Sequence, residues 1–335
     1  MERVDVDSDG DIILAVANTL ELRVSSRILT LTSPVFKAML GPHFAEGQAL
    51  RNATKETPKT ISLPDDNAAD MQLLCFVLHP TNINVPEAVS VGHVRAFAEL
   101  VDKYGCAGAV KYTTSVWLSV LEEERDNLLV LQYPEELLPA SYYLDNPRYF
   151  SRFTNILARR SEECKDDFLP KRDKRLPPGL VQEINKAMLN NEKELQQRLG
   201  DIVGSLVEAF AYCAAPEFRH EENNEPYYYS EEEQRCTHPV RIVHMYMEAF
   251  MEARLWPCRN RPQRLCRLLA QIDQLELPMD EASDLCATCA AVVAQLHRDF
   301  ECLKEKATTA FAGVCLDCFR AGERLAGPCR FPHQQ

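Results

Sequence analysis

The chain has 335 residues, of which 46% are hydrophobic and 26% are charged, so it has the composition of a globular protein with room for two hydrophobic cores. Its formal net charge is −13. This charge disfavours non-specific binding to nucleic-acid backbone, which requires a basic surface.

The N-terminal region predicts a small sheet combined with helices. Residues 11–16 form a short apolar run and residues 20–24 alternate apolar with polar, so the two segments predict a hairpin that turns near Asn18. Pro34 follows hydroxyl residues and predicts the start of a helix after a polar approach. A third strand is expected at residues 61–63.

The helices that follow are predicted from apolar residues at helical spacing. One is expected to start near Pro64 and to end at His79, and another covers about residues 94–104. Residues 106–160 continue as helices that pack on the first domain. Together these segments predict an α+β fold for the first part of the chain.

The second half of the chain is predicted to be mostly helical. A stripe of apolar residues marks one long helix from residue 180 to about residue 212, and shorter helices are expected at 243–251, 265–275 and 283–308. The long helix has too few heptads for a partner-binding coiled coil, so packing inside a second domain is the preferred interpretation.

Composition marks a boundary between the two halves. Residues 165–179, with the sequence KDDFLPKRDKRLPPG, carry charges of both signs and three prolines. Their basic residues also fit a nuclear import signal, although Asp173 interrupts the cluster. The expected parts are an α+β domain at 1–120, a helical extension packed on it at 121–164, the connection at 165–179 and a helical domain with Cys and His residues at 180–335.

Five segments within residues 8–120 occur in an order that resembles the BTB/POZ domain, in the version common in uncharacterised fungal proteins. They are GDIILAV, LELRVSSRILTLTSPVFKAML, ISLPDD, LLCFVLHP and FAELVDKYGC. The resemblance covers about a third of the chain. It implies a small sheet capped by a helical cluster, self-association and the recruitment of protein partners.

The same resemblance suggests a partner-binding site at Phe44 and Glu46. BTB domains that recruit a cullin-type ubiquitin ligase carry a hydrophobic-x-Glu segment after the helix that corresponds here to residues 34–40, and Phe44-Ala45-Glu46 is similar in place and type. The alternative is that Phe44 packs and Glu46 is solvated. No repeat of solenoid or propeller period is present to read a ligase substrate.

Thirteen cysteines are expected to stay reduced. The N-terminus is acidic where a signal peptide is basic, and no apolar run is long enough to span a bilayer, so we expect an intracellular protein, in the cytoplasm or the nucleus. Cysteines there pack as small apolar residues, bind metals or react as thiols. Packing is the preferred interpretation for Cys75, Cys106, Cys164, Cys213 and Cys266.

The sharpest metal-ligand pattern lies near the C-terminus. Cys315-x2-Cys318 lets one tight turn present two sulfurs, while Cys329-x3-His333 offers a third sulfur and an imidazole. Tetrahedral zinc accepts such a set of three sulfurs and one nitrogen. Four ligands with no open position predict a structural ion. The segment also resembles the C-terminal cysteine and histidine signature of the same fungal proteins.

A second zinc site is predicted upstream, from a second Cys-x2-Cys pair completed by a Cys-x-His pair. Its predicted ligands are Cys236, His238, Cys286 and Cys289. Three other residues compete for the completing positions, namely Cys258, Cys302 and His244.

The sequence contains no recognisable catalytic motif. It has no phosphate-binding glycine loop, no G-x-S-x-G and no H-E-x-x-H. We therefore expect a non-enzymatic interaction or scaffold protein that has one or two structural zinc ions and binds protein partners, itself or a cullin among them. A substrate adaptor of a cullin-type ubiquitin ligase and a transcriptional regulator are the alternatives. Membrane association is not expected.

Overall fold

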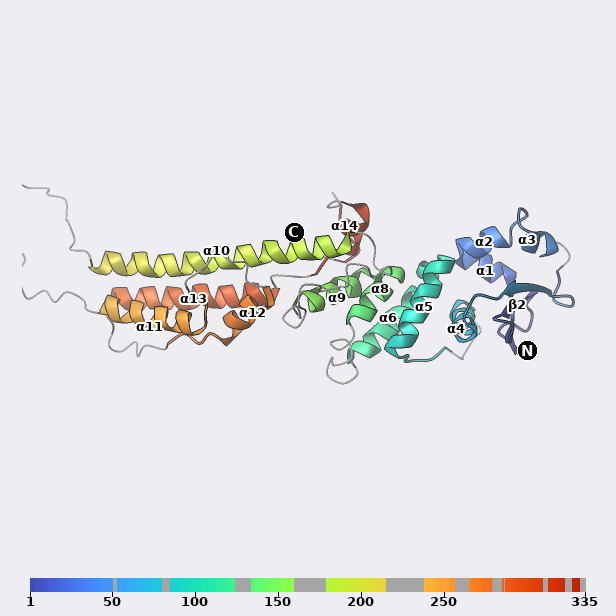
Figure 1. The fold of residues 1–335 in the computed structure, drawn as a ribbon, viewed down its shortest axis with the longest axis horizontal. Coiled ribbons are helices and arrows are strands. Elements are labelled where there is room, and N and C mark those ends of the chain that lie inside the picture. The colour runs from blue at the N-terminus through green and yellow to red at the C-terminus, as the bar shows by residue number, and fades with distance from the viewer. Residues whose placement is uncertain are drawn as a thin grey trace, which may run out of the picture. The chain divides into compact units, whose positions relative to one another are not determined.

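The computed structural model divides the chain into two compact units. Unit 1 comprises residues 1–157, 169–181 and 313–335, and unit 2 comprises residues 158–168 and 182–312. Figure 1 labels the helices and the strand β2 along the chain. The structure describes residues 1–50, 53–79, 85–123, 134–159, 179–214, 238–256, 265–278, 285, 287–309, 313–322 and 327–331.

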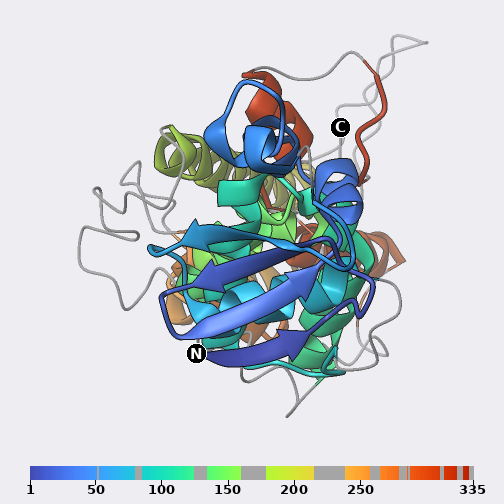
Figure 2. The same ribbon diagram turned by 90° about the vertical axis from the view of Figure 1, so that its right-hand side faces the viewer.

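Unit 1 contains a four-stranded sheet in the order β1-β3-β2-β4. The strands are β1 (Glu2–Asp5), β2 (Ile12–Val16), β3 (Leu20–Val24) and β4 (Lys59–Leu63). The antiparallel β2–β3 hairpin forms the middle of the sheet, and β1 and β4 pair with it in parallel at the two edges (Figure 2). The predicted hairpin and third strand are confirmed.

The edge strand β1 is missing from the sequence-based prediction. Its residues are mostly exposed, so they lack the apolar pattern that marks β2 and β3. Only its backbone pairing with β3 defines it. Ala17 and Asn18 turn the central hairpin with φ of 49° and 56°, a left-handed conformation that Asn adopts more readily than most residues.

Short helices follow the hairpin, and their capping residues can be recognised in the sequence. Pro34 opens α2 as predicted, and the Ser33 hydroxyl accepts the N–H of Phe36 at 3.0 Å. The polar segment before Pro34 was not predicted to be helical, but residues 26–32 form helix α1. The Ser25 side chain caps this helix in the same way. The helices of unit 1 are α1 (Ser26–Thr32), α2 (Pro34–Met39), α3 (Ala45–Ala49), α4 (Ala68–Leu78), α5 (Val91–Tyr104), α6 (Ala107–Glu123), α8 (Pro134–Tyr143), α9 (Pro147–Arg159) and α14 (Leu316–Ala321).

Helices α2 and α5 meet in the core of unit 1. The rings of Phe36 and Tyr104 stack with centroids 4.4 Å apart, and the Ser33 hydroxyl donates to the Tyr104 carbonyl at 2.5 Å. The Tyr104 hydroxyl donates to the buried Asp66 carboxylate at 2.6 Å, and burial raises the pKa of Tyr104. Gly105 ends α5 with φ 63°, where an added Cβ would lie 3.0 Å from the Pro34 ring.

Helix α4 begins later than the sequence suggested. Its cap is Asn67, whose side chain accepts the N–H groups of Ala69 and Asp70, whereas the predicted start lay near Pro64. Asp66 is unavailable as a cap because its carboxylate binds the side chains of α5. The tertiary contact therefore moves the start of the helix.

Unit 2 is helical in the stretches that the structure describes, and its long helix is confirmed. The helices are α10 (Leu180–Ala214), α11 (His238–Glu252), α12 (Leu265–Gln274) and α13 (Ala287–Thr309). The Tyr246 hydroxyl on α11 contacts His297 Nε2 on α13 at 2.7 Å, and the rings of Phe250 and Phe300 meet edge to face. None of the described helices combines the length and the apolar composition required to cross a bilayer.

The C-terminal tail differs from the expected domain division. The sequence assigned all of residues 180–335 to one helical domain, but residues 313–335 belong to unit 1. The described part of this tail contacts α8 and α9. The chain therefore returns to the first unit after residue 312. Spacing along the sequence carries no sign of this return.

Buried His79 gives unit 1 an acid-sensitive pair of hydrogen bonds. Its Nδ1 lies 2.8 Å from the Cys75 carbonyl and its Nε2 accepts the N–H of Ser25 at 3.2 Å, so the neutral ring with the proton on Nδ1 satisfies both. Burial lowers the pKa of His79, and the bond to Cys75 and the charge of Asp7 only partly oppose this.

We expect acidification from about pH 7.5 to about pH 5.5 to destabilise unit 1 through His79. Above about pH 6.5 the ring is neutral in both the folded and the unfolded chain; below it the unfolded chain binds the proton more readily, so the free energy of unfolding falls by at most about 1.4 kcal/mol per pH unit. Urea unfolding should be followed by Trp117 fluorescence in a Trp256→Phe background. The variant His79→Gln should show a smaller loss, and an equal loss in both proteins would refute the prediction.

Candidate metal centre

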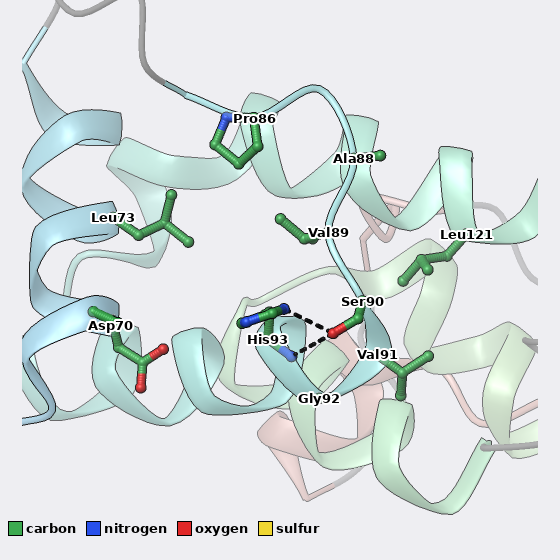
Figure 3. Close-up of a pocket in the computed structure, with 11 residues that line it drawn as sticks. Asp70, Leu73, Pro86, Ala88, Val89, Ser90, Val91, Gly92, His93 and Leu121 are labelled. Atoms are coloured by element: carbon green, nitrogen blue, oxygen red, sulfur yellow. Dashed lines mark hydrogen bonds between the residues drawn. The ribbon is translucent and has the colours of Figure 1, made fainter.

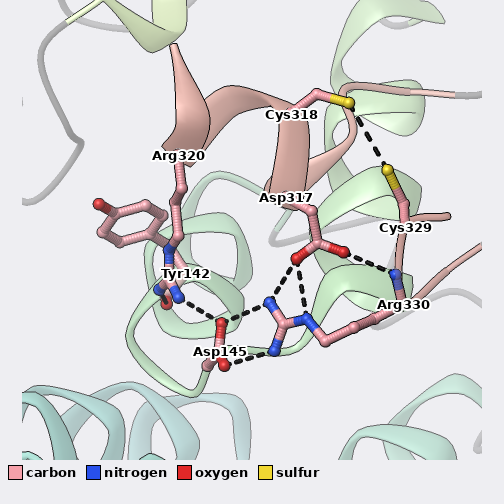
Figure 4. Close-up of polar contacts among 7 residues, drawn as sticks. All are labelled: Tyr142, Asp145, Asp317, Cys318, Arg320, Cys329 and Arg330. Atoms are coloured by element: carbon pink, nitrogen blue, oxygen red, sulfur yellow. Dashed lines mark hydrogen bonds and ion pairs between the residues drawn. The ribbon is translucent and has the colours of Figure 1, made fainter. Parts of the chain in front are cut away.

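Three of the predicted zinc ligands come together around the short helix α14. Cys315 is the N-cap residue of this helix, Cys318 lies one turn later, and Cys329 lies on the returning segment. Their sulfur atoms all lie within 4.8 Å of one another, and the sulfurs of Cys318 and Cys329 are 3.6 Å apart (Figure 4). The cluster therefore offers three sulfur ligands to one metal ion.

Without a metal ion, the surroundings of the three sulfurs disfavour the charged thiolate form of Cys329. Desolvation and the neighbouring sulfurs of Cys318 and Cys315 raise the pKa of Cys329 to about 12. A bound cation would reverse this effect, because a metal ion favours the thiolate form of its ligands. Within the described stretches, no second group of three Cys, His, Asp or Glu side chains lies as close together.

An ion pair joins the two segments that carry the sulfurs. Asp317 lies between Cys315 and Cys318, and its carboxylate accepts the backbone N–H of Arg330 at 2.7 Å and the Nε–H of Arg330 at 2.8 Å. This arginine directly follows Cys329, and its guanidinium lowers the pKa of Asp317. The pair thus sets the position of Cys329 relative to the other two sulfurs.

The same arginine docks the cluster on the turn between α8 and α9. Figure 4 shows the Arg330 guanidinium between the carboxylates of Asp317 and Asp145. Arg320 also pairs with Asp145, donates to the Tyr142 carbonyl at 2.8 Å and lies over the Tyr142 ring. Asp145 has φ 52° and therefore turns the chain sharply where it meets both arginines.

Apolar and backbone contacts complete the docking. The Phe319 ring lies 6.1 Å from the ring of Phe150, and the N–H of Val314 donates to the Thr154 hydroxyl at 2.8 Å. Gly313 has φ 89°, and an added Cβ there would lie only 1.8 Å from the carbonyl oxygen of Ser151. Glycine is thus required where the tail reaches α9.

The fourth predicted ligand and most of the second site lie outside the described residues. His333 follows the last described residue of the tail, so its ligand role stays a prediction. The same holds for the second site, because Cys236 and Cys286 lie outside the described stretches. His238 begins α11, and Cys289 is fully buried on α13.

Two of the cysteines that were assigned to packing are confirmed in that role. Cys75 and Cys106 are buried, and burial raises the pKa of the first to about 12 and of the second to about 11. Cys164 lies outside the described residues, and the side chains of Cys213 and Cys266 are not described. The buried pair forms no disulfide.

The proposed partner residues lie at the start of α3. Phe44 is the N-cap residue of this helix and is 51% exposed, so the alternative that it packs in the core is wrong. Glu46 lies in the first turn of α3 and is half-buried. Leu31, another apolar residue of this region, is 77% exposed. Exposed apolar side chains therefore occur both on α1 and at the start of α3.

A cavity of about 800 Å³ lies beside α4 and the N-terminus of α5 (Figure 3). Its lining is mainly apolar, and burial raises the pKa of Asp70 on one wall. The Ser90 hydroxyl and His93 Nδ1 are 2.8 Å apart and bind each other, which fixes the first turn of α5. No chemistry is assigned to this cavity.

Comparison of the chain with protein-family models and with curated proteins gives no match. Sequence reasoning found the sulfurs but missed the residues that place them, namely Tyr142, Asp145, Asp317, Arg320 and Arg330. The opposite charges beside Cys318 and Cys329 were a usable signal for the Asp317–Arg330 pair. No local signal connects Asp145 with an arginine that follows it by 185 positions.

We expect Arg330→Met to weaken metal binding by the cluster by about 10–100-fold, the usual effect of removing a group that orients metal ligands. Competition of the full chain with a chromogenic chelator for Zn²⁺ measures this affinity. Arg198→Met is the matched control, because it removes an exposed arginine that pairs with Glu194 on α10. Equal affinities of the two variants would show that Arg330 does not position the sulfurs.

Proposed function

We propose that this chain is a non-enzymatic protein-interaction protein whose tail is held on unit 1 by a structural zinc ion. The observation that carries the zinc proposal is the gathering of Cys315, Cys318 and Cys329 within 4.8 Å of one another. Zinc is the favoured metal because thiolate-rich tetrahedral sites of this spacing are typical of structural zinc. Its role is to fix the tail, and no reaction is assigned to it.

The fourth ligand is proposed to be His333. It follows Cys329 at a spacing that zinc sites commonly use, and neutral imidazole complements three thiolates. With four protein ligands the ion has no open position for a substrate. This ligand count supports a structural role over a catalytic one.

Elemental analysis of the purified full chain is expected to find about one zinc ion for the tail site, or about two if the site of Cys236, His238, Cys286 and Cys289 also binds. Cys318→Ala should lose one ion. The matched control Cys106→Ala should keep it, because this buried cysteine donates only to the Val101 carbonyl.

His333→Ala tests the fourth ligand separately. Three thiolates remain in that variant, so the ion should stay but bind more weakly, and chelators should remove it at lower concentration.

The zinc proposal as a whole is tested on the unaltered chain. Zinc-free protein from cells grown with ample zinc would refute it outright.

The interaction role is supported by the resemblance of residues 8–120 to BTB/POZ domains and by apolar side chains on the surface of unit 1. Leu31, Val35 and Phe44 are all exposed, and they lie on or next to the short helices α1, α2 and α3. Exposed apolar groups of this kind are common where a partner binds. The partner is proposed to be a protein, either a second copy of the chain or a cullin.

A cullin-type ubiquitin ligase is the more specific candidate, because Phe44 is exposed and Glu46 follows it by two residues in the first turn of α3. In a pull-down with a purified cullin, Phe44→Ala should reduce capture by about tenfold or more, since loss of an aromatic anchor that the partner buries costs about 1.4 kcal/mol or more. Met251→Ala, which removes an exposed apolar side chain from α11 in unit 2, is the control for a general loss of apolar surface. No capture by the unaltered chain would eliminate the adaptor role.

A further inference from the structure

Two sulfurs of the candidate metal centre lie close enough to react with each other. The sulfur atoms of Cys318 and Cys329 are 3.6 Å apart, and the sulfur of Cys315 lies within 4.8 Å of both. A disulfide bond is about 2.05 Å long, so Cys318 and Cys329 can be bonded when their sulfurs move about 1.5 Å closer. The cluster therefore contains a pair of thiols that is placed for oxidation, a use that is separate from metal binding.

Contacts made by the protein alone hold this pair together. Cys318 lies on α14, and the carboxylate of Asp317 in the same helix accepts the backbone N–H of Arg330 at 2.7 Å. The Asp317 side chain is only 10% exposed, so water screens its charge less than that of a fully exposed carboxylate. Arg330 directly follows Cys329. The ion pair thus keeps the Cys329 sulfur beside the Cys318 sulfur without the help of an ion.

The pair is also within reach of small oxidants. Cys318 and Cys329 are partly exposed, whereas Cys75 and Cys106 are buried in unit 1. Oxidation of cysteines follows their exposure, so a small oxidant reaches the two tail thiols before the buried ones. Cys302 on α13 is exposed as well, but it lies outside the three-sulfur cluster. Exposure and a close second sulfur therefore coincide at Cys318 and Cys329.

We propose that Cys318 and Cys329 are a site of oxidative modification, at which a hydroperoxide converts the two thiols into a disulfide. One sulfur attacks the outer oxygen of the peroxide and the O–O bond breaks, which gives a sulfenic acid and an alcohol that takes up the thiol proton. The second thiol attacks the sulfur of the sulfenic acid, and water leaves. The two sulfurs lose two electrons and two protons, and the peroxide takes up both.

The disulfide removes two of the three sulfur ligands of the cluster. A disulfide sulfur carries no thiolate charge, and metal binding requires the thiolate. Oxidation therefore abolishes metal binding by the cluster, and reduction of the bond by a dithiol restores it. This consequence rests on the proposed zinc site, whereas the disulfide itself depends only on the geometry of the two sulfurs.

Disulfide mapping tests the modification site. The full chain is stripped of metal with a chelator and treated with hydrogen peroxide, and the remaining thiols are alkylated. Digestion without reduction, by trypsin and a protease that cleaves before aspartate, puts Cys315, Cys318 and Cys329 on three different peptides. Mass spectrometry should find residues 317–320 linked to residues 325–330. A main product that links Cys315, or oxidation without any link, overturns the proposal.

Serine variants identify the two partners. Cys315→Ser should still form the link between Cys318 and Cys329, because these two sulfurs are the pair that lies 3.6 Å apart. The matched control Cys302→Ser removes an exposed thiol outside the cluster and should form the link as fully as the unaltered chain. Loss of the link in either variant overturns the assignment of the pair.

Zinc release distinguishes failure of this proposal from failure of the zinc proposal. When zinc-loaded protein is treated with hydrogen peroxide, a chromogenic chelator should record about one ion more from the unaltered chain than from Cys318→Ala, and a dithiol should let that ion rebind. Zinc that stays bound after the link has formed overturns the loss of metal binding. A chain that forms the link but never binds zinc rejects the zinc proposal alone, and a chain that binds zinc but forms no link rejects the modification site alone.

Discussion

The return of the tail to helices α8 and α9 is the constraint on which the organisation of this protein depends. The hydrogen bond from Val314 to Thr154 joins residues 160 positions apart, and it makes the last described residues part of the first unit. Everything in residues 182–312 is then an insertion between two segments of unit 1. A glycine at position 313 is needed for this return, because the Ser151 carbonyl occupies the place of any side chain.

The sequence predicts local structure well where apolar spacing and caps agree. The β2–β3 hairpin, the start of α2 at Pro34 and the long helix α10 follow from such patterns. The start of α4 could not be placed, because Asp66 forms a tertiary bond with Tyr104 and leaves the cap to Asn67. The strand β1 could not be recognised either, since only its pairing with β3 distinguishes it from a loop.

The cluster of three cysteines shows the same division between local and distant information. Cys315, Cys318 and Cys329 could be chosen from residue type and spacing, and the structure brings their sulfurs together. Their environment could not be foreseen, because Asp145 and Tyr142 are contributed by a turn far earlier in the chain. A ligand pattern thus indicates which side chains gather, whereas the surface on which they are anchored depends on the whole fold.

The energetics explain why a metal suits this position. Closing a loop of more than about 100 residues costs on the order of 5 kcal/mol of chain entropy, although each doubling of length adds only about 0.6 kcal/mol. Exposed pairs such as Arg330–Asp145 contribute about 1 kcal/mol or less, so they do not offset this cost alone. A structural zinc ion contributes about 10–16 kcal/mol in small domains. An ion bound by the three sulfurs would therefore stabilise the return of the tail even across residues 182–312.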